Sequence, residues 1–136
     1  MQYYTDEETR DIFRNYVIND FDDWNDFDWE RIDPKFFSDV QADEVYRGTK
    51  GSDEVITAKW SNGTTDIQSA QEFAWDYYLN RELEQNGKTV SLYALSSHNG
   101  MICLRKVFDE DKTVFHNEEE VILRDAVWRR VQSWAL

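Results

Sequence analysis

Residues 117–134 read NEEEVILRDAVWRRVQSW, and this C-terminal stretch has the pattern of a capped helix. Asn117 with Glu120 forms a capping box, in which each side chain serves a free backbone amide at a helix start. Acids lead the stretch and Arg124, Arg129 and Arg130 follow, which suits a helix dipole. The apolar residues recur at helical spacing, at Ile122, Leu123, Ala126, Val127, Val131 and Trp134. We therefore predict a C-terminal helix.

Strand patterns lie upstream of this stretch. Segments 90–95 and 101–108 are rich in apolar and β-branched residues, and Asn99-Gly100 between them is typical of a hairpin turn. Residues 54–60 alternate and are followed by the turn sequence Ser61-Asn62-Gly63. Lys112–His116 adds a further short strand. These segments predict a small antiparallel sheet of three or four strands.

Two more capping boxes predict helices. Thr5-Asp6-Glu7-Glu8 opens a helix over about residues 6–19, and Thr65-Asp66-Ile67-Gln68 opens a long central helix that ends near Asn86-Gly87. The predicted fold is α+β, with the small sheet packed against the central helix and the C-terminal helix. We expect one domain, 1–136, with an acidic helical part at 1–47 and an α+β part at 48–136.

The charge of the chain limits its partners. The 136 residues carry 28 acidic and 15 basic side chains, a net charge of −13, and residues 1–44 alone account for −10. A protein that binds nucleic acid or an anionic membrane directly normally needs a positively charged surface, so both functions are disfavoured. The chain has one cysteine, Cys103, an N-terminus without a secretory pattern, and no run of apolar residues that spans a bilayer. We predict a cytoplasmic protein.

Patterns of known catalytic and metal sites are weak or absent in the sequence. His98 lies in a predicted turn, where a neighbouring serine rarely points at it, and the spacing of zinc ligands is missing from the sequence. An EF-hand that starts at Asp26 fails, because its sixth position is Arg31 and its twelfth is Phe37. Glu110-Asp111-Lys112 matches only a fragment of a nuclease motif. We predict a protein that is no enzyme and takes neither metal nor cofactor.

The most unusual segment is 20–33, DFDDWNDFDWERID, where acids alternate with aromatic rings. One interpretation is a solvated element whose rings pack inward. The other is an anionic surface: if the segment is helical, Asp22, Asp26, Glu30 and Asp33 share one face. Acids one turn apart then lie roughly 5–6 Å from each other, comparable to the roughly 3.4 Å between phosphates on a DNA strand. The predicted partner-binding residues are Asp20, Asp22, Asp23, Trp24, Asp26, Asp28, Trp29, Glu30 and Asp33.

Small, very acidic, aromatic-rich proteins without a catalytic pattern resemble the nucleic-acid mimics of phages and mobile elements, such as anti-restriction and anti-CRISPR proteins. The resemblance is one of type and carries over no residues. It implies an inhibitor that occupies the basic nucleic-acid-binding surface of a host protein, in the host cytosol if a phage encodes it. Two alternatives stay open: an immunity or antitoxin-type protein that neutralises a basic toxin or nuclease, and a small-ligand-binding or enzymatic domain with its pocket near His98.

Overall fold

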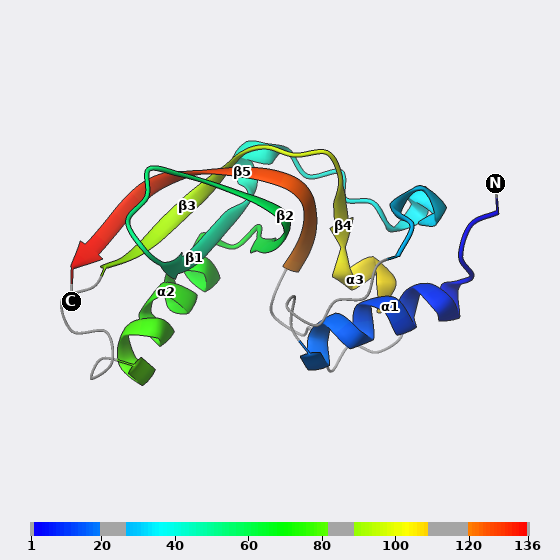
Figure 1. Cartoon of the computed structure of the whole chain (residues 1–136), viewed down its shortest axis with the longest axis horizontal. Coiled ribbons are helices and arrows are strands. Elements are labelled where there is room, and N and C mark those ends of the chain that lie inside the picture. Colours follow the sequence, from blue (N-terminus) through cyan, green and yellow to red (C-terminus); the bar gives the residue numbers. More distant parts are fainter. Residues whose placement is uncertain (1, 20–26, 82–88, 109–119, 136) are drawn as a thin grey trace.

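The computed structural model describes residues 2–19, 27–81, 89–108 and 120–135. Over these residues the chain forms one five-stranded antiparallel sheet, three α-helices and three short 3₁₀ helices (Figure 1). Their order is α1 (Asp6–Asn19), η2 (Trp29–Arg31), η3 (Pro34–Phe36), η4 (Ala42–Glu44), β1 (Tyr46–Lys50), β2 (Val55–Thr64), α2 (Ile67–Arg81), β3 (Thr89–Ser97), β4 (Met101–Cys103), α3 (Leu104–Val107) and β5 (Glu120–Ala135).

The predicted C-terminal helix is wrong: residues 120–135 form β5, the longest strand of the sheet. Val121 and Leu123 contact one core while Ile122 contacts the other, so this part of the strand is buried on both faces. Asp125 has a positive φ of 52°, which interrupts the alternation of side chains between the two faces of the strand. Ala126 then lies in the same core as Leu123. A continuous apolar run with an i, i+3 step has the same spacing as a helix, which explains the error.

The sheet is larger than predicted and closes on itself. Its order is β2-β1-β3-β5-β4, and β2 also pairs with β5, so β1, β3, β5 and β2 form a ring. Between β1 and β2 the ring closes through one residue pair, Tyr46 with Thr64. Beside it, the Arg47 guanidinium donates to the carbonyl oxygen of Asn62 at 2.9 Å. These four strands make a barrel-like sheet, and the fifth strand, β4, pairs with β5. The prediction of a small sheet of three or four strands packed against two helices is therefore wrong.

The predicted hairpin between residues 90–95 and 101–108 is also wrong. β3 and β4 do not pair with each other: each pairs with a different part of β5, residues 127–135 with β3 and residues 121–123 with β4, and the chain turns into α3 after Cys103. The predicted turn at residues 61–63 lies inside β2, where Gly63 pairs with Val121. A Cβ atom at position 63 would lie 2.7 Å from the Trp128 ring, so glycine is needed for packing at this position rather than for a turn.

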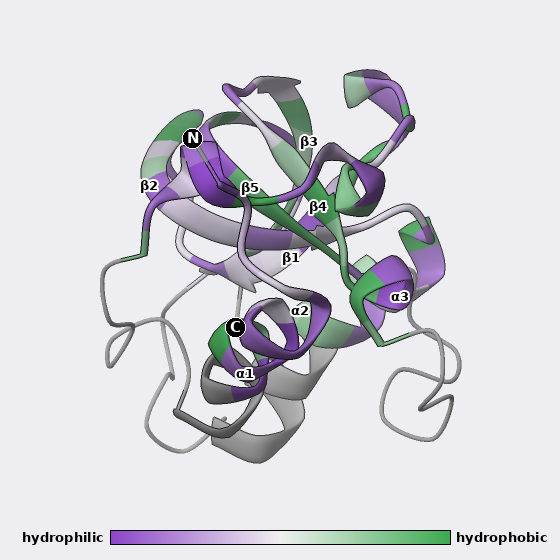
Figure 2. Ribbon diagram, turned by 90° about the vertical axis from the view of Figure 1, so that its right-hand side faces the viewer, coloured by the Kyte–Doolittle hydropathy of each residue, from purple (hydrophilic) through white to green (hydrophobic). Residues whose placement is uncertain are grey.

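Two hydrophobic cores lie on opposite sides of the strands β4 and β5. The core inside the barrel consists of Val45, Tyr93, Leu95, Met101, Val121, Leu123, Ala126 and Trp128. The outer core joins the N-terminal region to the sheet through Phe13, Trp29, Ile32, Phe36, Ile102, Leu104, Val107, Phe108 and Ile122. Figure 2 shows β4 hydrophobic along its length and α1 carrying both hydrophilic and hydrophobic residues.

The helices α1 and α2 form where their capping patterns predict. In α1, the Thr5 amide donates to Glu8 Oε1 at 2.9 Å and the Glu8 amide donates to Thr5 Oγ1 at 3.1 Å. In α2 the capping side chain is Asp66 rather than Thr65, since Asp66 accepts from the Gln68 amide at 3.1 Å. The helix α2 (15 residues) contacts β1 and β3. The predicted helical part at 1–47 is only partly helical after α1, because the described residues 27–44 contain just three short 3₁₀ turns.

Candidate functional site

The described end of the acidic segment, residues 27–33, is not part of a continuous helix. Asp28 caps η2 by accepting from the Glu30 amide at 3.1 Å, and Asp33 caps η3 by accepting from the Lys35 amide at 3.0 Å. Ile32, between the two turns, has extended backbone angles. Glu30 and Asp33 therefore do not share a helix face. Other predicted partner-binding residues lie outside the described residues, namely Asp20, Asp22, Asp23, Trp24 and Asp26.

The Trp29 side chain points into the protein, as expected from the interpretation that the aromatic rings of the acidic segment pack inward. Its side chain is 9% exposed, and its ring stacks on Phe37 with the centroids 5.8 Å apart. The Trp60 ring lies 5.5 Å away, and the Arg124 guanidinium carbon is 5.7 Å from the Trp29 centroid. A Cβ atom at Gly100 would lie 2.3 Å from the Trp29 ring. The ring thus anchors the segment to the sheet and presents little surface to a partner.

Glu30 adds a polar contact to the same attachment. Its Oε1 lies 3.3 Å from an Arg124 guanidinium nitrogen of β5, and the Glu30 side chain is still 67% exposed. An ion pair this exposed contributes about 0–1 kcal/mol, because water competes for both groups. Of the predicted partner-binding residues that the structure describes, Asp28 and Asp33 cap turns, Glu30 is paired and Trp29 is buried.

The other described acids of the first 44 residues, apart from Glu8 of the α1 capping box, fall into two groups. Three form ion pairs on the surface: Asp6 with Lys35 at 2.6 Å, Asp11 with Arg14 at 2.7 Å and Asp39 with Lys106 at 3.7 Å. Three more are exposed and form no ion pair with the described part of the chain: Glu7, Asp43 and Glu44. The described negative charge is therefore partly compensated near α1 and uncompensated at η4.

His98 has a local role in the chain turn. Its Nδ1 accepts from the Gly100 amide at 3.0 Å, and the Asn99 amide donates to the Arg124 carbonyl oxygen of β5 at 2.8 Å. The turn is therefore held against β5. Within the described ranges, no group of three or more His, Cys, Asp or Glu side chains is placed to hold a metal ion, and no helix is long and apolar enough to cross a membrane.

A groove of about 570 Å³, whose described lining is mainly cationic, is not predicted by any pattern in the sequence. The groove brings together residues of α1, η3, β4 and α3, which are up to 100 positions apart in the chain. The four basic residues of the lining, Arg10, Lys35, Arg105 and Lys106, belong to no recognisable sequence motif, so no local pattern predicts that they meet. Comparisons with protein families, with curated proteins and with solved structures found no match for this chain.

Proposed function

We propose that this protein is an inhibitor that occupies the basic nucleic-acid-binding surface of a partner protein. The single observation that carries the proposal is the charge: about three-quarters of the net −13 belongs to residues 1–44. A polyanionic surface attracts a cationic groove over several ångströms and raises the association rate. The same charge makes the protein itself a poor ligand for DNA or RNA.

The arrangement of the fold supports the proposal. The helix α1 and the 3₁₀ turn η3 lie at one end of the molecule, and the C-terminal end of β5 lies at the other (Figure 1). Most of the N-terminal acids that the structure describes therefore belong to one end, and a charge concentrated on one end orients the protein as it approaches a cationic partner. The aromatic contacts of Trp29 and the Glu30–Arg124 pair attach this end to the sheet.

The acids proposed to bind the partner are those of segment 20–26, together with Glu7, Asp43 and Glu44. Asp28, Glu30 and Asp33 are further acids of the N-terminal third, but changing them also removes a cap or an ion pair. A test of binding should therefore leave these three side chains in place. The variant Asp20→Asn/Asp22→Asn/Asp23→Asn/Asp26→Asn removes four charges and keeps all three.

The experiment begins with a partner captured from host lysate and then measures its binding to labelled duplex DNA. We expect the protein to displace the DNA, and the four-amide variant to associate with the partner roughly tenfold more slowly at low salt. The control variant Asp53→Asn/Glu54→Gln/Glu72→Gln/Asp125→Asn also removes four exposed charges, but outside the N-terminal third. It should associate at nearly the rate of the unchanged protein.

Three results would contradict the proposal: a partner that binds DNA and this protein at once, equal effects of the two variants, or direct binding of this protein to DNA in a mobility-shift assay. A captured partner that is a toxin encoded beside this protein's gene would instead favour the immunity or antitoxin alternative, which relies on the same charges.

A further inference from the structure

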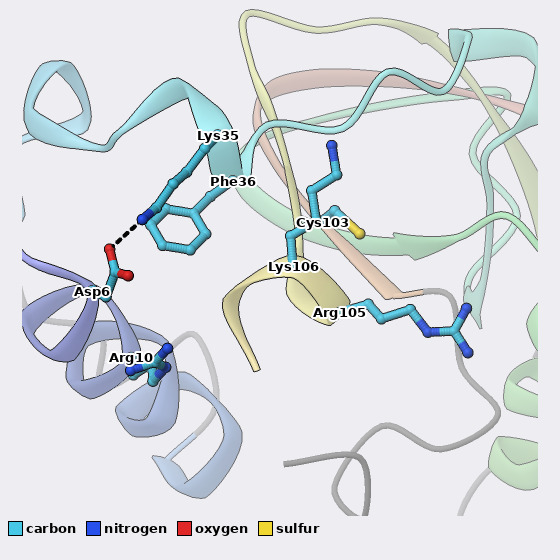
Figure 3. A pocket seen from close by; sticks show the side chains of 7 residues that line it. All are labelled: Asp6, Arg10, Lys35, Phe36, Cys103, Arg105 and Lys106. Carbon is cyan, nitrogen blue, oxygen red and sulfur yellow. Dashed lines mark ion pairs between the residues drawn. The ribbon is translucent and has the colours of Figure 1, made fainter. Parts of the chain in front are cut away.

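A cationic groove lies between α1, η3 and the junction of β4 with α3 (Figure 3). Its described lining contains four basic side chains and one acidic one, a net charge of +3 in a protein of −13. None of residues 27–33, the described part of the acidic segment, is among its described lining residues. The described lining residues are Asp6, Arg10, Lys35, Phe36, Cys103, Arg105 and Lys106.

The acid of the lining is already neutralised. Asp6 Oδ1 lies 2.6 Å from Lys35 Nζ, and Figure 3 shows the Lys35 side chain reaching across to it. Lys35 Nζ also lies 5.1 Å from the centroid of the Phe36 ring. This pair holds α1 against η3 at one side of the groove. The remaining described lining charges, those of Arg10, Arg105 and Lys106, are all positive.

Arg10 is the best-placed ligand for an anion. Its Nε donates to the Val107 carbonyl oxygen at 3.2 Å, which fixes the half-buried side chain between α1 and α3. Its two terminal nitrogens form no hydrogen bond or ion pair with the described part of the chain. They are the nitrogens with which a guanidinium binds a phosphate or carboxylate through two parallel hydrogen bonds.

The other side of the groove adds charge and an apolar wall. Lys106 Nζ donates to the Phe37 carbonyl oxygen at 2.7 Å and is 3.7 Å from Asp39 Oδ2, yet its side chain is 42% exposed. Arg105 is exposed on α3, and Figure 3 shows its guanidinium directed away from Asp6. Phe36 and the partly exposed Cys103 supply apolar and thiol surface between the cations.

We propose that this groove binds a compact polyanion of metabolite size, either a phosphate monoester or a tricarboxylate. Its volume lies within the roughly 300–1,000 Å³ of small-molecule sites. A nucleic-acid strand is a poorer candidate, because the net charge of −13 would repel its extended negative charge. Binding at this groove is independent of the function proposed above.

The test is calorimetric titration at low ionic strength with two probes, adenosine monophosphate and citrate, and with adenosine as the uncharged control. We expect heat of binding from at least one anion and none from adenosine, and the probe that binds more tightly identifies the ligand class. Arg10→Gln should weaken binding about tenfold, because a charge-assisted pair is lost. Lys59→Gln removes one exposed charge from β2, and should change the affinity less than about twofold.

A second readout uses Cys103, whose position in the lining makes it a reporter of occupancy. The bound anion should slow the alkylation of Cys103 by iodoacetamide in the unchanged protein and in Lys59→Gln, but much less in Arg10→Gln. If Arg10→Gln fails to fold, Arg105→Gln is measured in its place. The proposal is overturned if neither anion binds, if adenosine binds equally well, or if Lys59→Gln weakens binding as much as the groove variants.

Discussion

At the scale of single residues, Gly48 lets a helix approach the sheet. A Cβ atom at this position would lie 1.8 Å from the Ala70 carbonyl oxygen and 2.8 Å from the Ala74 amide nitrogen, both backbone atoms of α2. Leu92 pairs with Gly48 across the strands and is buried on the same face. The small residues on both elements therefore allow close backbone contact between α2 and β1.

We predict that Gly48→Ala lowers the free energy of unfolding by more than about 3 kcal/mol, because backbone must move to make room. Gly51→Ala is the comparison: no atom lies within 4 Å of its Cβ position, but its φ is +112°. Its cost should be about 1–2 kcal/mol from strain alone. Urea unfolding of both variants measures the difference, and equal losses would show that packing at Gly48 is not tight.

The buried Trp128 depends on a single polar partner for its indole nitrogen. Its side chain is fully buried, and Nε1 donates to Ser61 Oγ of β2 at 3.1 Å. We expect Ser61→Ala to lower the free energy of unfolding by about 1–3 kcal/mol, because the indole N–H loses its partner inside the barrel. Ser96→Ala changes an exposed hydroxyl and should cost less than about 0.5 kcal/mol. Thermal unfolding followed by tryptophan fluorescence compares them.

At the scale of elements, the start of α1 makes stability depend on pH. Hydrogen bonds from the Thr5 backbone amide and side chain hold the pKa of Glu8 below its ordinary value of 4.5. A lowered pKa means that the native state prefers the ionised carboxylate. Its stabilising contribution is present above the ordinary pKa and is lost as the pH falls through the lowered one.

We therefore predict that Glu8→Gln reduces the loss of stability below pH 4.5, while at neutral pH it is slightly less stable than the unchanged protein. Urea unfolding at a series of pH values measures this slope. Glu7→Gln is the matched control, since Glu7 is exposed in the same turn and takes no part in the capping box. If both variants change the slope equally, general charge repulsion is responsible rather than the cap.

The two halves of β5 differ in burial, which predicts different sensitivity along one strand. Ile122 is fully buried and contacts the outer core, whereas Val131 is 58% exposed. Ile122→Ala should lower the free energy of unfolding by about 2–5 kcal/mol, through lost burial and the cavity left behind. Val131→Ala should cost less than about 1 kcal/mol. Similar losses in chemical unfolding would show that the exposed half of the strand also packs against another element.

At the scale of the whole molecule, the net charge of −13 opposes the compact state. Salt at about 0.15 M screens charges more than roughly 8 Å apart, so it should raise the melting temperature of this protein. The variant Asp20→Asn/Asp22→Asn/Asp23→Asn/Asp26→Asn should melt higher than the unchanged protein at low salt and gain less from added salt. Differential scanning calorimetry tests this, and a melting temperature that falls with salt would show that the ion pairs outweigh the repulsion.

The amino-acid sequence alone determines the features that depend on composition or on neighbours within a few positions. The net charge and its excess in residues 1–44 are counts, and the capping box of α1 and the Asp66 cap of α2 each join residues less than four positions apart. Strands β2 and β3 also follow from local alternation and β-branched residues, although their ends do not. These interactions are local, so a single sequence predicts them.

Only the tertiary structure decides the features that need residues distant in the chain. The segment 120–135 has helical spacing, but pairing with β2, β3 and β4 and burial on both faces make it a strand. The sequence leaves open whether Trp29 packs inward or meets a partner, and the contacts of its ring with Phe37 and Trp60 and its close approach to Gly100 place it inside. The cations of the groove likewise meet only when the chain folds. Burial and long-range pairing outweigh local preference by several kcal/mol, which explains why these features are absent from any local pattern.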